Sequence, residues 1–183
     1  GSQVTVKDES IIILLAQDRC GYSNLCRLLT AGRLRSEKGE SAVTWDEICR
    51  HESGLFALWG GDQSLVVSEA DPIEVSGNLR DAFGDRLYGM LTRHRREEEV
   101  LQEARLRERA KHYGFPLVAA NEVLYHTPAR RPLQDVLTAI RYGVPVASCG
   151  SRLKPNAEHA LHSPYIFTSL FADDPAAIMD VTT

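Results

Sequence analysis

The chain has 183 residues, which is the length of one domain or of one domain plus a fragment. Hydrophobic residues make up 43% and charged residues 25%, close to the average for globular proteins, which excludes a disordered, fibrous or disulfide-stabilised small protein. The formal net charge is −4. A dedicated nucleic-acid-binding protein is usually strongly basic, so we expect most contacts to any nucleic acid to be made elsewhere.

The sequence contains no signal for membrane insertion or secretion. Its longest apolar run, Ile11 to Ala16, is far shorter than the about 20 residues that a membrane-spanning helix needs. The N-terminus lacks a basic region followed by an apolar stretch. The four cysteines have no CxxC spacing, so we predict free thiols in a reducing cytoplasm. We predict that Gly1 and Ser2 are an expression scar and leave them out of the fold.

Strands and helices are predicted to alternate along the chain. Apolar, β-branched or alternating runs predict four strands at 11–16, 55–59, 86–91 and 116–120. Capping residues and helical spacing predict helices from Ser23, from the Thr44–Glu47 capping box, and over 76–83, 95–113, 132–141 and 163–171, with a last one opened by Asp174-Pro175. For the 95–113 helix, the predicted apolar stripe consists of Val100, Leu101, Ala104 and Ala110.

This alternation predicts the α/β class, with a mostly parallel sheet or barrel. Four strands are few for a closed barrel, so the chain is expected to be a piece of a larger domain.

The best candidate for chemistry is the segment 121–126, directly after the last predicted strand. Functional groups gather at the carboxyl ends of parallel strands. If the extended conformation continues, Glu122 and His126 lie on the same side and could share a divalent metal. The alternative is that His126 packs against Pro128 while Glu122 is solvated. The other histidines are predicted to have structural or electrostatic roles: His51, His94, His112, His159 and His162.

Basic side chains form three clusters that could touch phosphate. Arg93, Arg95 and Arg96 run into three glutamates, which favours ion pairs within the helix. The remaining candidates for glancing contact with a nucleic-acid backbone are Arg33, Arg35, Lys38, Arg130 and Arg131. They lack the interleaved aromatic residues that stack on bases.

Several stretches together resemble a known family. They are LLAQDRCGYSNLCRLLT at 14–30, GRLRSEKGE at 32–40, NEVLYH at 121–126 with RRPLQDVL at 130–137, and LKPNAE at 153–158. In this order they resemble the PHP (polymerase and histidinol phosphatase) domain of bacterial C-family DNA polymerases. Within that group the chain is most similar to the error-prone branch related to the α subunit of DNA polymerase III. The resemblance extends from about Ile11 to Ala177.

The resemblance implies a distorted (β/α)7 TIM-like barrel with metals at one end. Residues 3–183 would form a partial PHP domain that lacks the N-terminal strands, including the first strand with its HxH metal motif. Active relatives carry Asp and His two residues apart where this chain has Glu122 and Leu124, and Leu124 cannot bind metal. Gly61 falls near the place of a metal-binding Cys or His in some relatives. A functional trinuclear site is therefore not expected.

Two functions follow from the resemblance. The first is a non-catalytic or degenerate PHP segment of an error-prone polymerase in the bacterial cytoplasm. The parent chain would carry out Mg²⁺-dependent, DNA-directed DNA synthesis in replication and repair, including lesion bypass. The segment itself would need no cofactor, would be inactive alone, and would have the other polymerase modules as partners, with DNA bound mainly through them.

The alternative is a metal-dependent phosphoesterase, such as a proofreading exonuclease or pyrophosphatase, which would take Zn²⁺ or Mn²⁺ if the PHP site is intact. A third hypothesis, a stand-alone binding module, requires a native chain that begins near Gln3 and ends near Thr183. A barrel that is cut open exposes sheet edges, so we expect the isolated segment to form a homodimer or to rearrange its edge strands.

Overall fold

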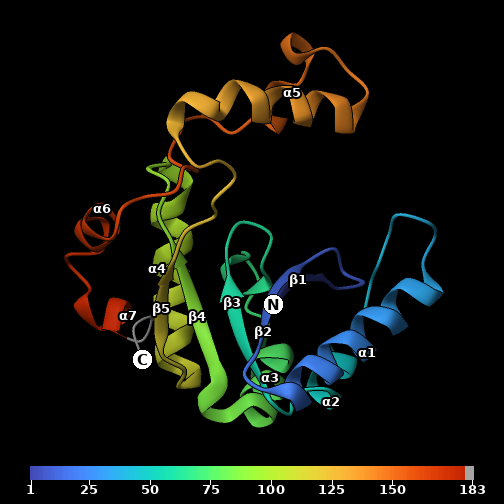
Figure 1. Cartoon of the computed structure of the whole chain (residues 1–183). Coiled ribbons are helices and arrows are strands. Elements are labelled where there is room, and N and C mark those ends of the chain that lie inside the picture. Colours follow the sequence, from blue (N-terminus) through green and yellow to red (C-terminus); the bar gives the residue numbers. More distant parts are fainter. Residues whose placement is uncertain (180–183) are drawn as a thin grey trace.

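The computed structural model describes residues 1–179. Its central element is a five-stranded mixed sheet (Figure 1). Its strands lie side by side in chain order: β1 (Ser2–Thr5), β2 (Ile11–Ala16), β3 (Leu55–Gly60), β4 (Leu87–Thr92) and β5 (Leu117–Ala120). The strands β1, β2 and β3 pair antiparallel, whereas β3, β4 and β5 pair parallel. The α/β class is confirmed, but the sheet is parallel only in its second half.

The antiparallel pairing of β2 and β3 has a simple geometric cause. Helix α1 (Arg19–Arg35) carries the chain away from the end of β2, and the segment through α2 (Trp45–Arg50) brings it back. The strand β3 therefore begins beside the end of β2, where Ala16 pairs with Leu55. Two helices in one connection return the chain to the end that it left, whereas one crossover helix would have delivered it to the opposite end.

The remaining helices are α3 (Ile73–Phe83), α4 (Glu97–Tyr113), α5 (Arg131–Tyr142), α6 (Pro164–Leu170) and α7 (Pro175–Met179). The capping box at Thr44 and the left-handed Gly114 at the end of α4 are confirmed. Helix α1 begins earlier than predicted, because Asp18 and not Ser23 is its N-cap: the amide of Gly21 donates to the Asp18 carboxylate at 2.8 Å. The four cysteines are free thiols, as predicted.

The strand β1 was not predicted, because it is short and begins in the two residues that we left out. Ser2, expected to lie outside the fold, is in register with Leu14 of β2. The side chains of Val4 and Val6 are buried, which anchors this edge of the sheet.

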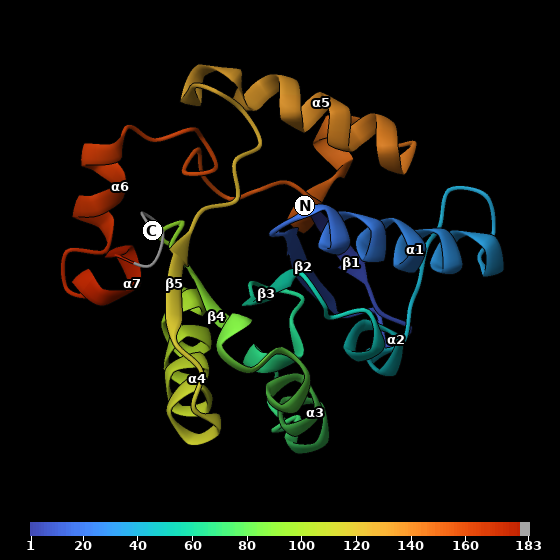
Figure 2. The same cartoon turned by 60° about the horizontal axis from the view of Figure 1, so that its bottom comes forward.

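One face of the sheet forms the hydrophobic core with the helices. Figure 2 shows α1, α2, α3 and α4 following the same side of the sheet. Under them lie the alternate strand residues Ile12, Leu14, Leu55, Ala57, Trp59, Leu87, Leu91 and Ala119. None of the helices within residues 1–179 combines the length and the apolar character that crossing a bilayer requires.

The predicted apolar stripe of α4 is confirmed only at Ala110, since Val100, Leu101 and Ala104 are all exposed. Val100 and Leu101 are 75% and 57% exposed, whereas Leu106, Arg109 and Ala110 are buried. The Arg109 guanidinium donates to backbone carbonyls of residues 65–69, among them Val66 at 2.9 Å. These charge-assisted hydrogen bonds allow the charged Arg109 to be buried on the side of α4 that faces the core. A search for apolar spacing does not find such a residue.

The opposite face of the sheet, here called the inner face, is also apolar. It consists of Ile11, Ile13, Leu15, Phe56, Leu58, Tyr88, Met90 and Val118, which alternate with the core residues along β2 to β5. The register places Leu58 beside both Ile13 and Tyr88, and Met90 beside Val118. Helix α5, on the side away from α1–α4 in Figure 2, packs chiefly against the short η3 (128–130) and η4 (146–148) turns of its own segment. On the inner face Met90 and Val118 are buried, Leu15 is exposed and the other five side chains are half-buried. Within residues 1–179 the inner face is therefore a row of large apolar side chains that is only partly covered.

Gly21 allows the first turn of α1 to approach the start of β3. A Cβ at this position would lie 1.8 Å from the carbonyl oxygen of Gly54. We therefore expect Gly21→Ala to lower the free energy of unfolding by about 1–3 kcal/mol, the cost typical of overpacking. The measurement is urea unfolding followed by circular dichroism.

Gly77 in α3 is the matched control, since a Cβ there would meet nothing within 4 Å. Gly77→Ala should raise the free energy of unfolding by about 0.5–1 kcal/mol, because alanine favours a helix interior over glycine. Equal effects of the two substitutions would contradict this account of the contact.

Candidate functional site

Polar side chains meet where the three parallel strands end. Asp62 follows β3, His94 follows β4, and Glu122 follows β5. The segment 153–162 closes over them, tied to the chain after β5 by a bridge between Tyr125 and Ala160. We call the following residues the strand-end cluster: Asp62, His94, Arg96, Glu99, Glu122, Lys154, Asn156 and His159.

The buried pair His94 and Glu99 forms the centre of this cluster. His94 is 2% exposed and Glu99 is 6% exposed. The backbone amide of His94 donates to Glu99 Oε2 at 2.7 Å, and His94 Nδ1 lies 2.9 Å from Glu99 Oε1. Arg96 donates its amide and its guanidinium to the same carboxylate and also binds Asp62. Glu99 thus links the end of β4, the end of β3 and the first turn of α4.

The backbone fixes the tautomer of His94. The amide of Glu122 donates to His94 Nε2 at 3.2 Å, so Nε2 carries no proton and the ring proton is on Nδ1, directed at Glu99. The side-chain amide of Asn156 donates to the His94 carbonyl at 2.6 Å. Both ring nitrogens of His94 are therefore used: Nε2 joins the end of β4 to the chain after β5, and Nδ1 joins it to the first turn of α4.

A second histidine, His159, stacks on the first. The two ring centroids are 4.0 Å apart at an interplanar angle of 11°. His159 is 1% exposed, and its Nδ1 lies 3.0 Å from Glu122 Oε2. The ammonium of Lys154 lies 2.7 Å from the same oxygen. His159 and Lys154 together hold the pKa of Glu122 at about 2, with the contact to His159 the larger cause.

The pKa of Glu99 is also held at about 2, by a different balance. Burial of this carboxylate favours its neutral form, but the hydrogen bonds from the His94 ring and from the amides of Arg96 and His94 outweigh burial. Arg96 adds a favourable positive charge. Glu99 is therefore a buried, ionised group whose charge is shared among several donors.

The prediction that Glu122 and His126 share a divalent metal stays a prediction. The structure engages Glu122 with Lys154 and His159, whereas His126 is exposed. Within residues 1–179, no three His, Cys, Asp or Glu side chains are arranged so that they could hold a metal ion. His94 uses both ring nitrogens and the charge of Glu122 is neutralised by Lys154, so neither is available as a metal ligand here, whereas the ring nitrogens of His159 have no aligned hydrogen-bond partner.

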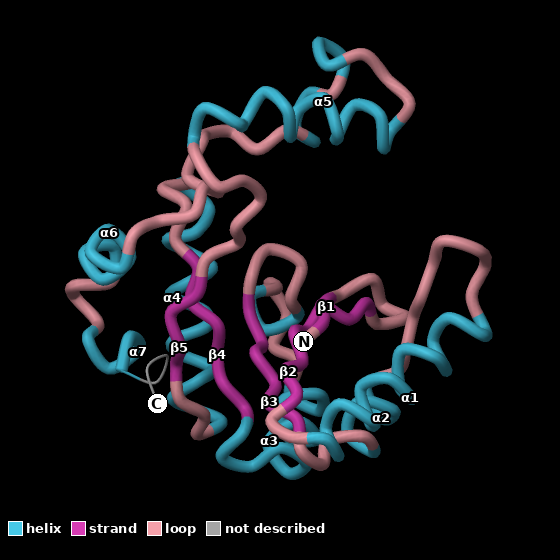
Figure 3. The backbone as a smooth tube through the Cα atoms, in the orientation of Figure 1, coloured by secondary structure: helices cyan, strands magenta, loops and turns pink. Residues whose placement is uncertain are grey.

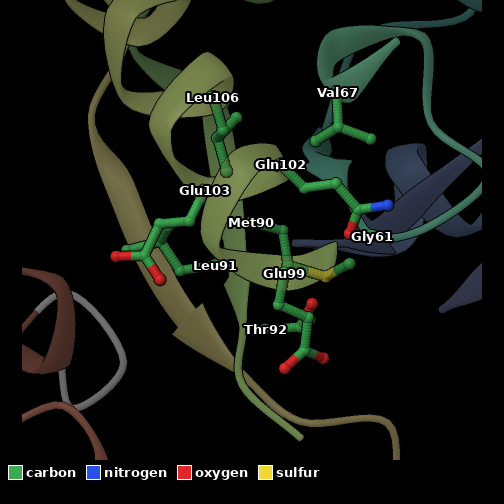
Figure 4. Close-up of a pocket in the computed structure, with 9 residues that line it drawn as sticks. All are labelled: Gly61, Val67, Met90, Leu91, Thr92, Glu99, Gln102, Glu103 and Leu106. Atoms are coloured by element: carbon green, nitrogen blue, oxygen red, sulfur yellow. The ribbon is translucent and has the colours of Figure 1, made fainter. Parts of the chain in front are cut away.

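A small pocket lies beside the cluster and has Glu99 in its lining (Figure 4). Met90, Thr92 and Gly61 contribute from the strand ends, and Gln102 and Leu106 from α4. Its volume is about 10 Å³, which is about enough for one water molecule. A larger cavity of about 440 Å³ has Arg96 and Glu99 in its lining, together with Arg93, Glu103 and Arg107. The cluster therefore connects segments of the chain and also borders a cavity in the size range of ligand pockets.

The five predicted phosphate contacts fall in two separate places. Arg33 and Arg35 lie at the end of α1, with Lys38 in the loop that follows, whereas Arg130 and Arg131 begin α5 (Figures 1 and 2). Arg35 pairs with Glu47 and Arg131 donates to the carbonyl of Lys154 at 2.8 Å. The structure thus does not bring the two groups together.

Sequence reasoning did not predict that the rings of His94 and His159 are buried and stacked on each other. His94 could have been found, because it follows a strand end by the same rule that selected Glu122. His159 lies in an irregular segment far along the chain, and no periodic pattern marks it. Only the folding of 153–162 over the strand ends makes it part of the cluster.

The chain is similar in sequence to segments of error-prone DNA polymerases. It is 36% identical to the error-prone DNA polymerase of Anaeromyxobacter dehalogenans (strain 2CP-1) over 176 residues, which are 91% of the chain and 15% of the relative. It is 33% identical to that of Pseudomonas fluorescens (strain Pf0-1) over 180 residues, 98% of the chain and 17% of the relative. Error-prone DNA polymerase 1 of Agrobacterium fabrum is 32% identical, over 97% of the chain and 16% of its own length.

The chain is therefore related in sequence to a segment of DNA polymerases, and the matching relatives are error-prone DNA polymerases. The resemblance inferred from the motifs is confirmed. The chain spans only 15–17% of the length of these three relatives. No protein-family model matches the chain.

Removing the charge of Glu99 should reveal its contribution to stability. We expect Glu99→Gln to lower the free energy of unfolding at pH 7 by on the order of 2–3 kcal/mol. Because the pKa is lower in the folded chain than its ordinary value of 4.5, this stability is present above about pH 4.5 and is lost as the pH falls toward 2. Urea unfolding between pH 3 and pH 7 measures it.

The adjacent Glu98, exposed in the same helical turn, is the control. Glu98→Gln should leave the unfolding free energy within about 0.5 kcal/mol of the parent. The interpretation fails if the two variants lose the same stability or if the loss in Glu99→Gln grows toward low pH.

The tautomer of His94 is open to direct measurement. Nitrogen-15 NMR of the imidazole rings should show His94 with a proton on Nδ1 and a bare Nε2, because Glu122 donates to Nε2. Exposed His126 serves as a reference ring in the same spectrum. A protonated Nε2 on neutral His94 would rule out the hydrogen bond that joins β4 to β5.

Proposed function

We propose that this chain is a PHP-type segment of an error-prone DNA polymerase, forms part of a distorted TIM-like barrel, and is not catalytic by itself. The observation that carries the proposal is the apolar inner face. Leu58, Tyr88, Met90 and Val118 stand side by side on the face opposite the helices. In an α/β barrel the helices cover the outside and the inward residues of the strands pack as layers in the middle.

We expect an apolar inner face of this kind to pack against further polypeptide segments. Met90 and Val118 are already buried, but Leu15 is exposed and Leu58 and Tyr88 are half-buried. Complete transfer of a large apolar side chain from water contributes about 1.5–3 kcal/mol, and burying the exposed part of this row gains a share of that for each residue. Strands from elsewhere in the parent polymerase would provide the other half of the layer. The antiparallel β2 and β3 depart from a regular barrel and agree with a distorted one.

The strand-end cluster supports a structural role for the segment. Its carboxylates are neutralised by Arg96 and Lys154, and its central histidine has no free nitrogen. DNA synthesis by the parent chain would rely on carboxylates that hold Mg²⁺ in other modules. DNA would be bound mainly through those modules, in the bacterial cytoplasm.

One observation favours the alternative of a metal-dependent phosphoesterase. Both ring nitrogens of His159 are buried and lack an aligned hydrogen-bond partner. If ligands from other parts of the parent chain reach this ring, the assembled domain would bind Zn²⁺ or Mn²⁺. Measuring the metal content of a full-length polymerase that contains this chain in place of its own segment separates the two proposals.

A chimera tests the proposed function. The matched segment of the Pseudomonas fluorescens polymerase is replaced by this chain, and primer extension on a DNA template is measured. We expect the chimera to extend the primer, while the same polymerase with the segment deleted, and this chain alone, do not. Primer extension or DNA hydrolysis by the chain alone would overturn the proposal.

The inner face gives the chimera a sharper test. Leu58→Asp places a charge between Ile13 and Tyr88 and should reduce primer extension at least tenfold, because a buried unpaired charge prevents the layer from closing. Leu34→Asp is the matched control, since Leu34 is 83% exposed on α1, outside the inner face. Equal activity of the two variants would argue against a barrel interior.

A further inference from the structure

Helix α5 presents an apolar stripe to solvent. Leu133, Val136, Leu137 and Ile140 are 52%, 44%, 52% and 70% exposed. Their spacing of three and four residues places all of them on one side of the helix. In Figure 3 the helix stands apart from those that cover the sheet and leads into a long, mostly irregular segment.

The helix is held in place by its own neighbours, so the stripe is preformed. Gly143 ends α5 in the left-handed conformation, and the amide of Val144 donates to the carbonyl of Ala139 at 3.1 Å. Ala139 and Cys149 are buried on the other side of the helix. The Arg152 guanidinium lies 4.7 Å from the ring centre of Tyr142. A rigid helix loses little conformational entropy when a partner binds.

Charge around the stripe has one sign. The segment 128–154 contains five basic residues and one acidic residue, in a chain whose net charge is −4. Arg130 and Arg141 are exposed and flank the stripe on the same side at helical spacing. The single acidic residue, Asp135, lies on the far side of the helix, 3.9 Å from Arg131.

The basic flank decides between a second copy and a different partner. In an antiparallel pair of identical helices the same flanks meet, which would place Arg130 opposite Arg141 of the second copy. Like charges there oppose pairing. Nucleic acid would use the arginines but would leave the apolar stripe in water. An amphipathic helix with acidic residues beside its apolar side satisfies both features.

We infer that the α5 stripe is a docking surface for an acidic amphipathic helix from another module of the parent polymerase. This inference rests on the proposed function, because it assigns the surface by which the segment joins the remaining modules. The apolar side of the incoming helix covers Leu133, Val136, Leu137 and Ile140. Its acidic flank lies along Arg130 and Arg141.

Two synthetic helical peptides test the inference on the 183-residue chain. Both have leucines spaced to form one apolar side; one carries glutamates beside them and the other carries lysines. Fluorescence anisotropy of the labelled peptides should show at least tenfold tighter binding of the acidic peptide. The preference should shrink as salt rises.

Variants assign the binding to α5. The double variant Val136→Ser, Leu137→Ser should weaken binding of the acidic peptide at least tenfold. The double variant Arg130→Glu, Arg141→Glu should bind the lysine peptide more tightly than the acidic one. Leu34→Ser, at an apolar position on α1 that is even more exposed, is the control and should bind as the parent does. Circular dichroism checks that each variant stays folded, as expected for solvent-exposed positions.

Three results would overturn the inference. They are no binding of either peptide, equal binding of both, and a dimer in light scattering that Val136→Ser with Leu137→Ser disperses, which would make a second copy the occupant. None of these results bears on primer extension by the chimera. The docking surface and the proposed function can therefore fail separately.

Discussion

A single buried carboxylate, that of Glu99, organises the end of the sheet where the parallel strands stop. It accepts hydrogen bonds from the backbone and the ring of His94 and from the backbone and the guanidinium of Arg96. Parallel strands end at one edge, so the loops that leave them need partners for their polar backbone groups. Glu99 supplies these partners for the loop after β4, and through Arg96 and Asp62 it also reaches the loop after β3.

The connection to β5 also depends on Glu99, indirectly through the ring of His94. Since Glu99 accepts a hydrogen bond from His94 Nδ1–H, the opposite ring nitrogen is free to accept one from the backbone amide of Glu122 after β5. Glu122 in turn contacts Lys154 and His159, which brings the segment 153–162 over the strand ends. The order of these contacts explains how a cluster rich in ionisable groups holds the strand ends together, beside a pocket with room for about one water molecule (Figure 4) and a larger cavity that Arg96 and Glu99 line.

Within residues 1–179, two apolar surfaces are only partly covered, which agrees with the proposal that the chain is a segment of a longer protein. The inner face of the sheet and the stripe on α5 are made by different elements, and each follows a regular spacing, of two residues in the strands and of three and four in the helix. Regular spacing of this kind is typical of surfaces that pack against something. The relatives are several times longer than this chain, which agrees with that interpretation.

Local sequence signals located most elements correctly. The apolar run 11–16, the capping box at Thr44 and the glycine after α4 each depend on neighbouring residues only, and each is where it was expected. The N-cap of α1 was placed too late, because Ser23 and Asp18 have similar capping preferences and only the Gly21 amide distinguishes them. The exposed Val100 and the buried Arg109 reversed the predicted stripe, because the carbonyls of residues 65–69 are not visible in a local pattern.

By itself the sequence determined the α/β class, the alternating strands and helices, and the relation to error-prone polymerases, because these follow from short-range spacing and from motifs in order. Only the tertiary structure decided the antiparallel start of the sheet, the stacking of His94 on His159 and the engagement of Glu122 by Lys154. These features join residues that are far apart in the chain. Their free energy depends on distances that arise only after the helices have packed, so no local preference encodes them.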